Sequence, residues 1–168
     1  MRRQWFDEVL KISLATTAFG GMRMPFATSP LIFADQIDSP DHPPNTGELF
    51  IGAVRIRPRL APSSSAPVVF HQGEDLNLFL QAYAVATNPS TGKSDATITL
   101  KLISVNDGKS AMEIQKTSAG LKQTGEQITL QKSIPLTAVP KGEYHLCATV
   151  NDRIAHRSSA SDARVVVD

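Results

Sequence analysis

Hydrophobic and polar residues alternate along most of the chain after residue 47, and a period of two is typical of β-strands. The clearest case is 76–83, where one face carries Leu76, Leu78, Leu80 and Ala82, with Asn, Phe and Gln between them. Because no segment here has a helical period, the pattern disfavours an α/β fold. The same alternation predicts further strands at 50–57, 96–105, 111–116, 127–133 and 144–150, and through Ala163, Val165 and Val167.

Short clusters of turn-forming residues separate these strands. The Asn-Asp-Gly sequence at 106–108 predicts a tight hairpin, because Asp-Gly accepts the positive φ angles of such a turn. Further turns are predicted at 88–92, 140–142 and 151–152, and a phase change at Ile103 indicates a β-bulge or a change of face near the end of the strand. About seven strands with this spacing are typical of an all-β sandwich of the immunoglobulin or fibronectin-III type.

The in-phase apolar residues of these strands form the predicted core. Tyr144 begins a strand two residues after Gly142, as in a tyrosine corner, so we expect its ring to pack inward and its hydroxyl to cap nearby backbone. An antibody-type disulfide is excluded, because Leu146 occupies the position of the cysteine. The predicted core is Val54, Ile56, Leu76, Leu78, Leu80, Ile98, Leu100, Leu102, Ile114, Ile128, Leu130, Tyr144, Leu146, Ala148, Val150, Val165 and Val167.

Residues 1–46 differ from the rest and are predicted to be a poorly structured arm with a proline-rich linker, which leaves the sandwich to residues 47–168. The first residues are basic, as in a secretory signal, but Asp7, Glu8 and Lys11 interrupt the apolar run that a signal needs. Three prolines at 39–47 favour extended chain there. No uncharged run reaches the ~18 residues of a membrane-spanning helix, so no span is predicted.

Composition narrows the range of partners. The 17 Lys and Arg residues balance 16 Asp and Glu residues, and a net charge of +1 gives no field that would attract nucleic acid. Cys147 is the only cysteine, so an intramolecular disulfide is impossible. We interpret Cys147 as a small residue on the second face of its strand, because a reactive thiol needs an adjacent base that the sequence does not supply.

Three groups of polar residues are candidates for binding chemistry. One group recurs every second residue, which suggests either an anion-binding stripe or a solvated face that discourages edge pairing: Arg55, Arg57 and Arg59. Another lacks the glycine turn of a calcium loop and is interpreted as solvated linker: Asp35, Asp38 and Asp41. The third lacks the spacing of a zinc site: His42, His71, His145 and His156. The solvated face is favoured, and no catalytic, cofactor-binding or metal-binding residue is predicted.

Five segments carry a family resemblance through their order and spacing: Ser-Pro-Leu-Ile-Phe-Ala-Asp-Gln at 29–36, Phe-Ile-Gly at 50–52, the strand end at 55–58, Phe-x-x-Gly-Glu-x-Leu at 70–76, and 136–150. Together they resemble the C-terminal region of large, uncharacterised bacterial proteins, among them acidobacterial VWFA-related and GWxTD-domain proteins. The resemblance covers roughly residues 25–168. It implies a β-sandwich without assigned catalysis, appended to other domains of an exported protein.

The chain departs from that family in two motifs. It has no Asp-x-Ser-x-Ser sequence, so the metal-dependent site of a von Willebrand factor A domain is not implied, and it has no Gly-Trp-x-Thr-Asp sequence. In the family an earlier domain precedes the segment that corresponds to 29–36. We therefore expect residues 1–24 to be the remnant of a longer protein or an alternative start. The family points to the periplasm, the cell envelope or the medium.

Three hypotheses for function follow. The preferred one is a non-catalytic structural or protein-interaction module that binds through the loops at 61–67, 88–94 and 118–125. A carbohydrate-binding module is the alternative, although only Phe70, Phe79 and Tyr83 could supply its aromatic platform, since Trp5 lies outside the domain. An enzyme would need a site that is assembled only by folding.

Overall fold

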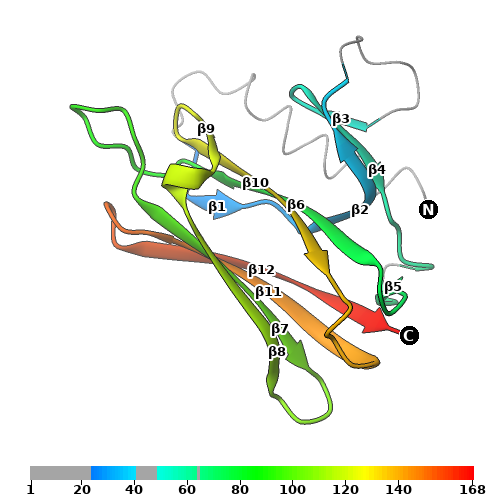
Figure 1. The fold of residues 1–168 in the computed structure, drawn as a ribbon. Coiled ribbons are helices and arrows are strands. Elements are labelled where there is room, and N and C mark those ends of the chain that lie inside the picture. The colour runs from blue at the N-terminus through cyan, green and yellow to red at the C-terminus, as the bar shows by residue number, and fades with distance from the viewer. Residues whose placement is uncertain (1–23, 41–48, 64) are drawn as a thin grey trace.

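The computed structural model describes residues 24–40, 49–63 and 65–168, and it is a sandwich of two β-sheets (Figure 1). In chain order the elements are β1 (Ala27–Thr28), β2 (Ile32–Asp38), β3 (Leu49–Ile51), β4 (Val54–Pro58), β5 (Val68–Phe70), β6 (Asp75–Tyr83), β7 (Ala96–Ser104), β8 (Ser110–Thr117), the 3₁₀ helix η1 (Ser118–Gly120), β9 (Lys122–Thr124), β10 (Gln127–Pro135), β11 (Gly142–Asp152) and β12 (Arg157–Val167).

The strands form a larger and a smaller sheet. The larger, seven-stranded sheet has the order β3-β4-β2-β6-β10-β9, and β1 also pairs with β6. The smaller, five-stranded sheet has the order β5-β12-β11-β7-β8. Strands β2, β6, β10 and β9 take the places of strands A, B, E and D of an immunoglobulin domain, while β12, β11 and β7 take those of G, F and C. The prediction of an all-β sandwich is confirmed.

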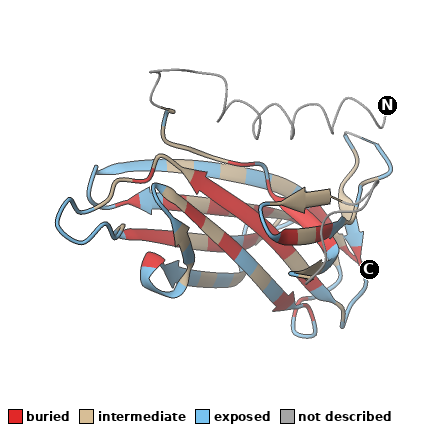
Figure 2. Ribbon diagram, turned by 90° about the horizontal axis from the view of Figure 1, so that it is seen from above, coloured by how far each residue is buried: buried red, intermediate tan, exposed pale blue. Residues whose placement is uncertain are grey.

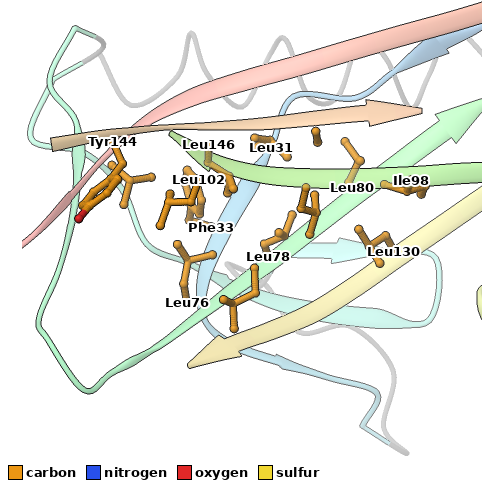
Figure 3. Close-up of a cluster of buried hydrophobic side chains, with 14 of the residues drawn as sticks. Leu31, Phe33, Leu76, Leu78, Leu80, Ile98, Leu102, Leu130, Tyr144 and Leu146 are labelled. Atoms are coloured by element: carbon orange, nitrogen blue, oxygen red, sulfur yellow. The ribbon is translucent and has the colours of Figure 1, made fainter. Parts of the chain in front are cut away.

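The main core lies between the two sheets, where Leu78 and Leu80 of the larger sheet face Ile98, Leu102 and Leu146 of the smaller one (Figure 3). Figure 2 shows the same distribution, with buried residues along the strands and exposed residues in the connections between them. Every residue of the predicted core is buried except Ile114, which is half-buried against it. Two of those residues, Val54 and Ile56, belong to a second cluster described below.

The predicted N-terminal arm is wrong for Ile32–Asp38, because these residues form β2 between β4 and β6. Leu31 and Phe33 belong to the main core, whereas Ile32 and Ala34 belong to the second cluster. A strand that is apolar on both faces has no alternation, which explains why the pattern did not predict it. Residues 1–23 and 41–48, which contain the rest of the predicted arm and linker, lie outside the described residues.

The predicted strand at 50–57 is two strands, because the chain reverses between β3 and β4 at Gly52, whose φ is +62°. The predicted hairpin at 106–108 is confirmed: Gly108 has a φ of +67°, and its amide donates to the carbonyl of Ser104 at 3.0 Å. The predicted bulge is confirmed by the register shift between Leu102 and Ile103. The predicted turn at 151–152 is displaced, because both residues end β11.

The tyrosine corner is confirmed at the start of β11. Tyr144 is 4% exposed, and its hydroxyl donates to the carbonyl oxygen of Pro140 at 2.7 Å. This contact fixes the connection from β10 to β11 across the end of the sandwich.

Candidate interaction surface

Three connections meet at one end of the sandwich, which we call the loop end. They are residues 84–95 between β6 and β7, residues 118–126 between β8 and β10, and the turn 153–156 between β11 and β12 (Figure 1, left). Backbone hydrogen bonds join them: the amide of Val85 donates to Glu126 at 2.8 Å, and that of Arg153 to Asp95 at 2.9 Å. The loop end is therefore one surface made from three parts of the chain.

Asp152, the last residue of β11, holds the connections of the loop end together. Its side chain is completely buried, and its carboxylate accepts hydrogen bonds from the backbone amides of Ala86 (2.9 Å) and Ala155 (3.1 Å) and from Nε of Arg157 (3.1 Å). Burial by itself would raise the pKa of Asp152, but these three donors together lower it below its ordinary value. The ionised carboxylate thus fastens the β6–β7 connection to the β11–β12 hairpin.

Arg157 extends the anchor to the start of the described chain. Its guanidinium carbon lies 4.6 Å from the centre of the Phe26 ring, a cation–π geometry, and its Nη2 donates to the carbonyl of Ala84. Ala84 has a φ of +53°, which is unfavourable for a residue with a side chain. The contacts of Arg157 with Ala84 and of Asp152 with Ala86 hold the chain at this bend and two residues after it.

Gln123 joins two of the loops that the sequence indicated. Its carboxamide oxygen accepts from the amide (3.1 Å) and hydroxyl (3.0 Å) of Ser94, and its nitrogen donates to the carbonyls of Gly92 (3.0 Å) and Gly125 (2.9 Å). The Ser118 hydroxyl adds a further link, since it donates to the carbonyl of Ser94 at 2.9 Å and accepts from the amide of Ala96 at 3.1 Å. The loops at 88–94 and 118–125 are therefore held together.

The loop end is exposed and carries charges of both signs. Residues 88–93 are exposed throughout, as are Ala119, Gly120, Lys122 and residues 124–126. Arg153 and Asp95 form an ion pair at 3.1 Å at its margin. Such a surface offers hydrogen bonds and mixed charge rather than an apolar pocket.

The third predicted loop, 61–67, lies at the opposite end, because it leads into β5, which pairs with the C-terminal end of β12. Arg59, the centre of a cluster, precedes it in the chain. Arg59 donates to Asp35 at 2.6 Å and to Glu74 at 2.7 Å, and its guanidinium carbon lies 4.5 Å from the centre of the Phe70 ring. These bonds lower the pKa of Glu74, chiefly through the Arg59 side chain, and raise that of Arg59. Loop 61–67 therefore does not share a surface with the other two.

The interpretation of the three acids as linker residues is wrong for two of them. Asp35 and Asp38 are part of β2, where they pair with Arg59 (2.6 Å) and with Arg55 (2.7 Å) of the neighbouring chain segment. These pairs also involve Arg55 and Arg59 of the suggested anion-binding stripe. Arg57, the third arginine of the stripe, is exposed. Asp41 lies outside the described residues.

The histidines are distributed over separate places. His71 contacts Asp168 near the C-terminal end of β12, His145 lies in β11, and His156 lies in the β11–β12 turn, while His42 is outside the described residues. In the part of the chain that the structure describes, no three His, Cys, Asp or Glu side chains are grouped so that they could hold a metal ion.

Cys147 is half-buried on β11, and its pKa is raised by burial and by the charge of Asp162. A raised pKa keeps the thiol protonated at neutral pH, in agreement with its interpretation as a small packing residue.

The three aromatic residues considered for a sugar-binding platform do not form one. Phe70 and Phe79 are at most 1% exposed, and Tyr83 is half-buried with its hydroxyl donating to Gln81 at 2.7 Å.

The loops of this end were predicted from the sequence, but the contacts of Asp152, Ser118 and Gln123 that hold them together were not. Asp152 and Ser118 follow or end strands, where Asp and Ser often bond to nearby backbone, and this was a usable signal. Gln123 has none, because its partners are set by the packing of two distant connections.

Comparison with known proteins leaves the family open. Neither protein-family models nor the sequences of curated proteins match this chain. Across residues 24–40, 49–63 and 65–168 there is no helix with the length and apolar character needed to cross a membrane. The fold and the loop end therefore carry the functional argument.

Proposed function

We propose that the chain is a non-catalytic protein-interaction module and that the loop end is its binding surface. The observation that supports this most is the carboxamide of Gln123, which uses both its oxygen and its nitrogen to hold the loops at 88–94 and 118–125 together. Loops that are already ordered before binding lose less conformational entropy when a partner docks. Exposed loops on a rigid sandwich are also where binding residues concentrate.

Catalysis receives no support from the groups at this end. Asp152 is the one carboxylate buried there among the described residues, and its two oxygens are occupied by three donors that tie down backbone. A catalytic carboxylate has to reach a substrate. Asp152 instead has the surroundings of a structural anchor.

The alternative, a carbohydrate-binding module, also receives little support. Sugar-binding sandwiches present aromatic rings to their ligands, whereas Phe70 and Phe79 are buried and Tyr83 is engaged with Gln81.

Site-specific photo-crosslinking in the organism's own cells tests the proposed surface. A photoreactive residue placed at Ser90 or at Ala119 should join the chain to the same partner protein. The matched control is a photoreactive residue at Ala160, which is exposed on β12 away from the loop end and should capture no such partner. Equal capture from all three positions, or capture from Ala160 alone, would place the binding surface elsewhere.

The family resemblance adds a proposal about location, that the module belongs to an exported bacterial protein. The intact mass of the native protein in cell fractions tests this. A species well above 18.1 kDa in the envelope or the medium would support a tail module of a larger exported protein. A species of 18.1 kDa confined to the cytoplasm would contradict it.

A further inference from the structure

The larger sheet has a second apolar cluster on the face that points away from the smaller sheet. Successive side chains of a strand point to opposite faces, so Phe79 faces outward while Leu78 and Leu80 point into the main core. Ile32 is directly opposite Phe79 in the β2–β6 register. The buried members of the cluster are Ile32, Ala34, Val54, Ile56 and Phe79, each at most 3% exposed.

The described hydrophobic residues that pack against this cluster belong to the same sheet. They are Ile37 of β2 and Leu49 and Ile51 of β3. Strands of one sheet lie side by side, so they flank a face of that sheet without covering it, and the smaller sheet covers the opposite face. Because Phe79 is only 1% exposed, a further layer must lie above it.

Within this chain only one segment outside the described residues has the composition of such a layer. Residues 41–48 read Asp-His-Pro-Pro-Asn-Thr-Gly-Glu and contain no large apolar side chain, and position 64 is a single serine. Residues 1–23 contain a group of large apolar side chains: Trp5, Phe6, Val9, Leu10, Ile12 and Leu14.

The spacing within that segment fits a one-sided apolar surface. Gln4, Asp7, Glu8 and Lys11 are spaced i, i+3, i+4 and i+7, so a helix would gather them on one side. Leu14 would be left on the polar side, and the helix would turn these apolar residues to the other side: Trp5, Phe6, Val9, Leu10 and Ile12. Eleven residues in a helix span about 16 Å.

The position of the described N-terminal residues brings this segment close to the cluster. The described chain starts at Met24, shortly before β1, and β1 pairs with Ala82 and Tyr83 of β6. Phe79 lies four residues back along the same strand, a distance of about 13 Å. The segment is therefore long enough to reach over the cluster.

We propose that residues 4–14 dock with their apolar side on the outer face of the larger sheet and cover Phe79 and Ile32. This is an intramolecular interface separate from the loop end, and it does not depend on the proposed function. Displacement of the segment would uncover an apolar face that could associate with another surface.

Trp5 is the only tryptophan of the chain, and its fluorescence reports the docking directly. In the intact protein its emission should lie at shorter wavelength, and acrylamide should quench it several-fold less, than in the isolated peptide 1–23. Val9→Asp, on the apolar side of the segment, should restore the peptide-like emission while the circular dichroism of the sandwich is retained. Asp7→Asn, on the polar side, is the matched control and should leave the emission unchanged.

A second measurement, the binding of a hydrophobic dye, tests whether the segment covers the outer face of the larger sheet. The chain that begins at Met24 should bind a hydrophobic dye more strongly than the intact protein, and added peptide 1–23 should reverse this. Peptide-like Trp5 emission in the intact protein would overturn the proposal. So would a blue shift that appears only at concentrations where the protein dimerises or only with lipid vesicles, because a second copy or a membrane would then be the occupant.

Discussion

Each end of the sandwich has an arginine that lies on a phenylalanine ring and pairs with carboxylates, but the two ends differ in how far the acid is buried. At the loop end Arg157 lies on Phe26 and pairs with Asp152, whose side chain is 0% exposed. At the other end Arg59 lies on Phe70 and pairs with Glu74, whose side chain is 35% exposed. The same residue types thus produce two different kinds of junction.

The hydrogen bonds of the acids explain the difference. Asp152 accepts from the backbone amides of two separate connections, at Ala86 and at Ala155, so its charge is tied to the shape of the loop end. Glu74 accepts from one amide, that of His71 at 2.9 Å, within its own turn. A buried charge that loses its partners is costly, whereas an exposed ion pair contributes little. We therefore expect the stability of the loop end to depend strongly on Asp152, and that of the opposite end to depend strongly on no single acid.

The largest effect should come from Asp152→Asn. The substitution keeps the shape of the side chain but removes the charge that the buried donors require. We therefore expect the free energy of unfolding to fall by about 3 kcal/mol. Denaturant unfolding followed by circular dichroism measures this. A loss smaller than that caused by Glu74→Gln would contradict the expected difference between the two ends.

The stability that Asp152 contributes should also depend on pH. The folded-state pKa of Asp152 is lowered, so its stabilisation is fully present above the unfolded-state pKa of about 3.9 and is lost as the pH falls through the folded-state value. The difference in unfolding free energy between the native protein and Asp152→Asn should shrink as the pH falls from about 5 towards 2. A difference that stays constant over this range would mean that the Asp152 charge is not the source of the stabilisation.

A smaller effect is expected from Gln123→Ala. Removal of its half-exposed bonds to Ser94, Gly92 and Gly125 should cost about 1 kcal/mol, and amide exchange in 88–94 and 119–126 should become about fivefold faster. Exchange in β6 should stay unchanged. Gln115→Ala, an exposed glutamine on β8, is the matched control.

The smallest effect is expected from Glu74→Gln at the opposite end. Its pair with Arg59 is partly solvated, so the loss should be about 0.5 kcal/mol and should decrease further with added salt. The measurement is denaturant unfolding at low and high ionic strength. A loss as large as that of Asp152→Asn would show that exposure does not separate the two junctions.

The sequence predicted those parts of the fold in which one face is buried and the other is not. Leu76, Leu78 and Leu80 alternate with residues of the other face, so β6 could be predicted, and Gly108 marked the hairpin between β7 and β8. Strand β2 could not be found in this way, because Ile32 and Phe33 are buried on opposite faces. The split at Gly52 was hidden by apolar residues on both sides of the turn.

The candidate surface was predicted only in part, for a different reason. The loops at 88–94 and 118–125 were recognisable from their composition, but their joining depends on Gln123 and Ser94, which are 29 positions apart. Asp152 and Ala86 are 66 positions apart. Contacts over such distances are set by the order of the strands in the sheets, which a single sequence does not encode locally.

The affinity of the crosslinked partner for loop-end variants is the most direct test of the proposal that the loop end is the binding surface. The exposed residues 89–91 and 119–120 would be replaced by Gly-Ser sequences, which leaves Asn88, Ser94, Ser118, Leu121 and Gln123 in place. We predict that the Kd for the purified partner rises by about tenfold or more, a loss of about 1.4 kcal/mol of binding free energy, while Ala160→Ser leaves it unchanged. An unchanged Kd for the loop-end variant, with its fold intact, would contradict the claim that this end of the sandwich binds the partner.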